Sequence, residues 1–183
     1  RFVVCLTLGF LLAAPAVAYL INGWWNDGDN IVMDNVFLPA GVYGVPAENQ
    51  LAKWNEIDRV DLSHPFRIHP SPEYSFRLGD GRNTMGFLDL IGLKDRYKLS
   101  YVDALAWTSC IEGLTTPRYQ ECDMMLDPAL SWTLSPSASA WFQSVVLHEA
   151  GHARGLGHYS GWLSVMNPRV NALLRGDQLY MDD

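Results

Sequence analysis

The feature that most constrains this chain is the spacing of the histidines in HEAGHARGLGH, residues 148–158. The 183 residues contain only 5 histidines, and three of them lie in this stretch. On an α-helix, residues four apart differ by only about 40° in direction, so His148 and His152 leave the same face one turn apart. Both imidazoles can therefore reach one metal ion.

The third histidine requires a bend. A catalytic zinc takes three protein ligands and a water, and it binds imidazole nitrogen at about 2.0–2.1 Å. A continuing helix would carry His158 away from the ion, so the chain has to turn back. Gly155 suits that turn, because glycine adopts positive φ without steric cost. We therefore expect His148, His152 and His158 to be the metal ligands. The alternative is that these are core or surface histidines that bind nothing.

Glu149 directly follows the first of these histidines. Its side chain should point to the side of the metal, where it can reach a water without ligating the ion. This is the placement that a general base requires.

The order of the expected elements indicates an α+β domain. Leu51, Trp54 and Ile57 recur at helical spacing and predict a helix over 47–62. Short strands are expected in IVMDNVFL, FRIHP, YSFRL and NTMGFLD, and then over 103–112 and 121–127, with LGDGRN as a turn. A second helix should open at Ser135 and Pro136 as N-cap and first helical residue, and should stop at Gly155.

Beyond the histidines, SVMNP places Met166 just before Asn167 and Pro168. Together with HExxHxxGxxH, this resembles the metzincin clan of zinc endopeptidases, and the short spacing to the methionine resembles the matrixin family in particular. DALAWTS is similar to that family's substrate-side edge strand, and ECDMMLDPALSWT to the strand and loop before its active-site helix. The resemblance covers roughly residues 24–183 and is strongest over 103–170.

The resemblance implies a metzincin or zincin-like fold. We expect a single α+β domain with a mixed twisted sheet, an active-site helix and a C-terminal Met-turn in which Met166 lies beneath the metal site. It also implies a zinc metalloendopeptidase with one catalytic Zn²⁺ and Glu149 as the base. A protein or peptide substrate would pair as an extended strand with residues 104–109, and residues 168–174 would wall the pocket for the side chain after the cut.

Two other functions remain open on the same residues. One is a non-catalytic zinc-binding or protein-interaction module on a metzincin scaffold. The other is a zinc amidase or hydrolase that acts on a non-peptide substrate.

The first eighteen residues, RFVVCLTLGFLLAAPAVA, are typical of a secretory signal peptide with cleavage after Ala18. An uncleaved membrane anchor is the alternative. We expect residues 19–183 to form the catalytic domain, truncated at the C-terminus. The protein should then be secreted, either extracellular or periplasmic, with no membrane association after cleavage.

Cleavage would leave two cysteines, Cys110 and Cys122. A cysteine pair usually forms a disulfide in an oxidising compartment, and the short loop here would add about 2–3 kcal/mol of stability. Two buried free thiols are the alternative.

Charge and composition limit the partners. The net charge is −7 and only three lysines are present, which argues against a nucleic-acid partner. We expect a monomer. Asp27-Gly28-Asp29 and Asp80-Gly81-Arg82-Asn83 could hold calcium, although plain turns are favoured there. His64 and His69 are more often surface histidines than ligands.

Overall fold

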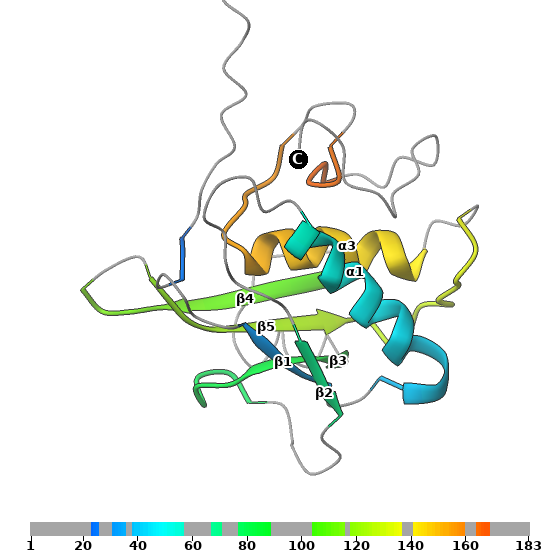
Figure 1. Ribbon diagram of the computed structural model, residues 1–183, viewed down its shortest axis with the longest axis horizontal. Helices are drawn as coiled ribbons and strands as arrows, with labels where there is room; N and C mark the ends of the chain where they lie inside the picture. Colours follow the sequence, from blue (N-terminus) through cyan, green and yellow to red (C-terminus); the bar gives the residue numbers. More distant parts are fainter. Residues whose placement is uncertain are drawn as a thin grey trace, which may run out of the picture.

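Among the described residues, a five-stranded mixed sheet forms the base of the structure, and two α-helices cover one of its faces (Figure 1). The computed structural model describes residues 23–25, 31–35, 38–56, 67–70, 77–88, 104–115, 118–136, 141–159 and 164–168. The expected signal peptide at 1–18 and the C-terminal residues from 169 lie outside the described residues, as does the predicted pocket wall beyond Pro168.

The strands run in the order β2-β1-β3-β5-β4. Their bounds are Val32–Asn35 for β1, Arg67–Pro70 for β2, Asn83–Phe87 for β3, Ala106–Glu112 for β4 and Tyr119–Leu126 for β5. Neighbouring strands are parallel, except that β4 pairs antiparallel with β5 at one edge. The predicted α+β class with a mixed sheet is therefore confirmed.

Helix α1 spans Val45–Glu56 and follows a π-helical turn at Ala40–Gly44 that the sequence pattern did not predict. Leu51 and Trp54 are buried, as the helical spacing indicated, and the helix packs against α3. The predicted helix over 47–62 is confirmed as far as Glu56. Its last six residues lie outside the described part of the chain.

Helix α3 spans Phe142–Ala153, so the predicted start at Ser135 and Pro136 was wrong. Trp141 is still extended and forms an isolated bridge with Thr133, and the amide of Phe142 donates to Thr133 O at 3.0 Å. This tertiary pairing holds Trp141 in an extended conformation, so the helix begins only at Phe142. Strand β4 also starts later than predicted, at Ala106 in place of residue 103. The strand predicted in YSFRL lies mostly outside the described residues.

The core lies between the sheet and the helices. Met33, Met85, Met124 and Leu126 supply its sheet side. The largest buried side chain from α3 is Phe142, which is joined by Val145, Val146 and Leu147 of the same helix. Because α3 is buried along most of its length, its position is set by packing on both the sheet and α1.

A disulfide joins Cys110 and Cys122, which are direct partners in the β4/β5 ladder. On this face of the ladder Ala106 is paired with Leu126, and Thr108 with Met124. The bond therefore locks the register of the edge strand β4, whose other long side has no neighbouring strand in the part of the chain that the structure describes.

Removing this bond should destabilise the fold. We expect the double variant Cys110→Ala/Cys122→Ala to lose about 2–3 kcal/mol of unfolding free energy, because the unfolded chain regains the entropy of an open loop. Urea denaturation monitored by tryptophan fluorescence measures this loss. A reducing agent should bring the wild type to the same midpoint and leave the variant unchanged. A wild-type midpoint that is indifferent to reduction would contradict the prediction.

Candidate metal centre

Two tryptophans hold the helix that carries the first two histidines. Trp54 Nε1 of α1 donates to Leu147 O at 2.9 Å, and Trp25 Nε1 donates to Ala153 O at 2.8 Å. Both bonds are buried. A buried indole N–H that is paired costs little, whereas an unpaired one is expensive, so these bonds favour one placement of α3.

His148 and His152 leave the same face of α3, and each imidazole is oriented by a backbone carbonyl. His148 Nδ1 lies 2.7 Å from Val165 O, and His152 Nδ1 lies 2.7 Å from Leu156 O. A carbonyl oxygen can only accept, so Nδ1 carries the proton in both rings. Nε2 of each neutral ring is then left with its lone pair, which is the state that binds a metal.

The chain bends back directly after the helix, at Gly155. Its φ is +95°, a conformation that is strained for residues with a side chain. A Cβ on this residue would also overlap the backbone oxygen of Gly23. The amide of Leu156 donates to Gly151 O at 3.0 Å and closes the turn. This bend carries His158 back towards the helix.

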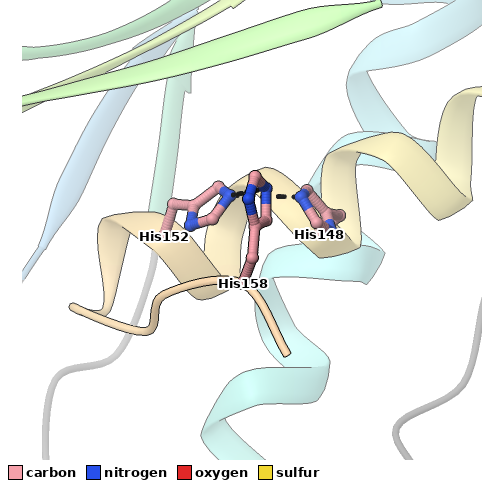
Figure 2. Close-up of side chains that lie close together, drawn as sticks. All are labelled: His148, His152 and His158. Atoms are coloured by element: carbon pink, nitrogen blue, oxygen red, sulfur yellow. Dashed lines mark hydrogen bonds between the residues drawn. The ribbon is translucent and has the colours of Figure 1, made fainter. Parts of the chain in front are cut away.

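The three imidazoles converge on one point (Figure 2). His152 Nε2 lies 3.1 Å from His148 Nε2 and 3.2 Å from His158 Nε2. Three nitrogens that ligate one tetrahedral zinc at about 2.0–2.1 Å lie about 3.3 Å apart, so the observed spacing fits such an ion. Since the protons of His148 and His152 sit on Nδ1, their Nε2 lone pairs face each other. That arrangement favours a cation between them.

Partial burial favours the neutral form of these rings, although His158 is the most exposed of the three. The pKa of His148 is lowered to about 4, chiefly by desolvation, with a smaller contribution from the nearby His158 and an opposing one from the hydrogen bond to the Val165 carbonyl. Desolvation also lowers the pKa values of His152 and His158. Neutral imidazole is the ligand form, so the site is in a binding-competent state at neutral pH.

Glu149 is almost fully buried beside the histidines, with 6% of its surface exposed. Burial raises the pKa of its carboxyl, while His152 and hydrogen bonds from Thr108 act in the opposite direction. The Thr108 hydroxyl of β4 donates to Glu149 Oε2 at 2.6 Å. The carboxyl group is therefore held by Thr108, interacts electrostatically with His152 and is largely shielded from bulk water.

Met166 lies in a short turn packed under α3, and its side chain is fully buried. The amide of Tyr159 donates to Met166 O at 2.9 Å, which ties the segment after His158 to this turn. Gly151 of α3 leaves room for the methionine, because a Cβ there would overlap Met166 Sδ and crowd Trp54 Cζ2. The preceding residue, Val165, supplies the carbonyl that orients His148.

Residues 110–183 match the family model for matrixins, peptidase family M10. The chain is matrixin-like over this stretch. The matched part contains all three histidines, Glu149 and Met166. Matrixins are zinc metallopeptidases, and the donor set described above agrees with that chemistry. A search of curated proteins finds no match.

Several contributors to this matrixin-like site could not have been identified from the sequence. The carbonyls of Val165 and Leu156 orient two histidines, but a backbone carbonyl carries no residue-type signal. Thr108 lies about forty positions before Glu149 and shows no local pattern with it. Gly151 could have been noticed as a glycine inside a helical pattern, which usually marks close packing.

Calcium binding, which the sequence left possible at two turns while favouring plain turns, receives no support. In the turn at 79–82, the amides of Gly79 and Gly81 both donate to the Glu121 carboxylate. Asp80 Oδ1 accepts from the amide of Arg82 at 3.0 Å. Calcium requires several oxygen ligands, whereas this turn directs N–H groups at its carboxylate neighbour. Residues 27–29 lie outside the described part, as does His64.

Two features restrict residue 155 to glycine, the positive φ and the close approach of Gly23, and a substitution can test both. Gly155→Ala should lower the unfolding free energy of the metal-free protein by about 2–3 kcal/mol, because backbone strain and the overlap with Gly23 add together. The matched control is Gly81→Ala, where φ is +78° but the Cβ would meet open space. If Gly155→Ala costs no more than this control in urea denaturation, the close approach of Gly23 does not constrain the bend.

The sheet face opposite α3 contains a buried carboxyl group, that of Asp123. Its protonation should make the free energy of unfolding depend on pH. The pKa of Asp123 is raised to about 8, chiefly by burial, while hydrogen bonds from Thr84 oppose the shift and neighbouring Glu121 contributes to it. In the unfolded chain this pKa is about 3.9. Between these two pKa values the folded state keeps a proton on Asp123 that the unfolded state has lost. The contribution of this group to the free energy of unfolding is therefore present at low pH and is lost as pH rises through about 8.

Relative to wild type, Asp123→Asn should therefore become more stable as pH rises from about 5 to about 8. Asparagine keeps an oxygen for the Thr84 amide and hydroxyl, which both donate to Asp123 Oδ1. Urea denaturation at the two pH values measures the difference, with Asp80→Asn in the exposed turn as the control. An equal difference between wild type and Asp123→Asn at both pH values would count against a proton on Asp123.

Proposed function

We propose that this protein is a secreted zinc-dependent endopeptidase. The observation that carries the proposal is the convergence of three neutral imidazoles beside one buried carboxyl group. The match of residues 110–183 to matrixins supports the same reading at the level of the family.

His148, His152 and His158 would hold the zinc through their Nε2 atoms. When bound, a zinc ion would polarise the scissile carbonyl and lower the pKa of water towards 7. The protein's own contribution is orientation, because hydrogen bonds to Val165 O and Leu156 O hold the first two rings in place before any ion arrives.

Glu149 would act as the general base. It takes a proton from the attacking water at a carboxylate oxygen and later delivers it to the leaving amine nitrogen. Its burial suits both steps, since a carboxyl group whose pKa is raised is a better base and is more readily kept protonated than an exposed one. Met166 would serve as the Met-turn residue, an apolar support under the histidines.

The substrate would bind along β4. This strand lies at the edge of the sheet and passes beside α3, so an extended peptide can add to it as a further strand. Main-chain hydrogen bonds of this kind accept many sequences, which suits a protein or peptide substrate. Side-chain preference would be set by pockets around the histidines.

Secretion is part of the proposal. The Cys110–Cys122 disulfide fits an oxidising compartment, and residues 1–18 have the pattern of a signal peptide. Among the described residues, no helix is long and apolar enough to cross a membrane.

The decisive variant is Glu149→Gln. It should still bind one zinc ion per chain but lose at least about 100-fold in kcat for peptide cleavage, because the amide cannot accept the proton of the attacking water. Zinc content by mass spectrometry and cleavage of casein and a mixed peptide library measure the two properties.

Glu48→Gln on the exposed start of α1 serves as the control and should cleave like wild type. A chelator should abolish cleavage by both active proteins, and added zinc should restore it. Bound zinc without any cleavage by the wild type would favour a non-catalytic module. A fully active Glu149→Gln variant would eliminate the proposed mechanism.

A further inference from the structure

The hydrogen bond between Thr108 and Glu149 joins the edge strand to the proposed base. Thr108 Oγ1 lies 2.6 Å from Glu149 Oε2 and 3.2 Å from the backbone oxygen of the same residue. A hydroxyl has a single proton to donate, and the bond to a carboxylate is the shorter and stronger of the two. The hydroxyl therefore holds one particular oxygen of Glu149.

The position of Thr108 is itself firmly set. Side chains alternate along a strand, so Ala106, Thr108 and Cys110 share the face of β4 that meets α3. Cys110 is bonded to Cys122, whose Sγ lies near Ala153 O of the helix. The disulfide thus prevents β4 from sliding along β5, and a slide by one residue would turn the Thr108 side chain to the other face.

The bond also matters for the carboxyl group. Glu149 is buried with 6% of its surface exposed, and a buried carboxylate without a donor is costly. With Oε2 held by Thr108, Oε1 is the oxygen that stays outside this contact. A base that must accept a proton in a defined direction gains from having one oxygen fixed and the other oxygen available.

We propose that Thr108 is a positioning residue for Glu149, whose hydroxyl fixes Oε2 so that Oε1 receives the proton of the attacking water. This inference rests on the proposed function. It assigns to β4 a second task besides pairing with the substrate, because the strand that would align the peptide also aligns the base. The substrate and the base are then positioned by one rigid element.

Two variants of Thr108 test the inference in the full chain. Thr108→Val removes the hydroxyl but keeps the shape, and should lower kcat about tenfold while KM changes less than about twofold. Thr108→Ser keeps the hydroxyl and should stay within about threefold of wild-type kcat. Zinc content should be unchanged in both, because neither variant touches an imidazole.

Thr84→Val is the matched control. The Thr84 hydroxyl also donates to a buried carboxyl group, Asp123, but on β3 and far along the chain from the histidines. This variant should lose stability comparable to that lost by Thr108→Val and retain wild-type kcat. A fall in kcat that Thr84→Val shares would reveal a general effect of stability, and would overturn the positioning role.

A second readout uses the metal-free protein. Thr108→Val should be destabilising in the wild-type background and much less so in Glu149→Ala, since the hydroxyl then has no carboxylate to bind. Additive losses of stability in this double-mutant cycle would overturn the inference. A wild-type kcat in Thr108→Val would also overturn it. So would an equal loss of kcat in Thr108→Val and Thr108→Ser. If the wild type binds zinc but cleaves nothing, the proposed function and the positioning role of Thr108 in catalysis both fail, while the cycle still decides whether the contact exists.

Discussion

The bend at Gly155 is the constraint on which the rest of the site depends. Helix α3 can supply two imidazoles from one face, but a third from the same helix would lie too far along the axis. The positive φ of Gly155 turns the chain two residues after the helix ends at Ala153, and the backbone of Gly23 occupies the space where a side chain would stand. The segment around Gly23 is further tied to the helix by Trp25, so residues far apart in sequence enclose this turn together.

Backbone carbonyls organise the polar interior around the bend. They accept from the two indoles that place α3, and they lie against Nδ1 of His148 and His152. Each of these side chains has a single N–H to satisfy on its buried side, and a carbonyl supplies the acceptor without adding charge. The result is a cluster of nitrogen lone pairs oriented by the fold itself, so an ion can bind with little reorganisation of its ligands.

Because side chains alternate between the two faces of a strand, the β4/β5 ladder places the groups near the histidines on one face and a pair of buried carboxyl groups on the other. The face towards α3 carries Thr108 and the disulfide, next to the proposed base. The opposite face carries Glu121, which accepts from the glycine turn at 79–82, and Asp123, which accepts from Thr84 of β3. Neighbouring residues of one strand thus lie in different environments on opposite faces of the sheet. Neither carboxyl group of β5 is on the face that meets the histidine-bearing helix. The period of two in a strand is what keeps these environments apart.

The sequence by itself determined the elements whose signals are local. Helical spacing predicted α1 and the shared face of His148 and His152, glycine marked the bend at Gly155, and short runs bounded by turn residues predicted the described strands. Tertiary structure decided the rest. The start of α3 at Phe142 depends on the pairing of Trp141 with Thr133, which overrides the capping signal at Ser135. The partners of the histidines and of Glu149 are two backbone carbonyls and a distant hydroxyl, which only the folded chain brings within hydrogen-bonding distance, because such contacts depend on position in space and leave no pattern in the order of residues.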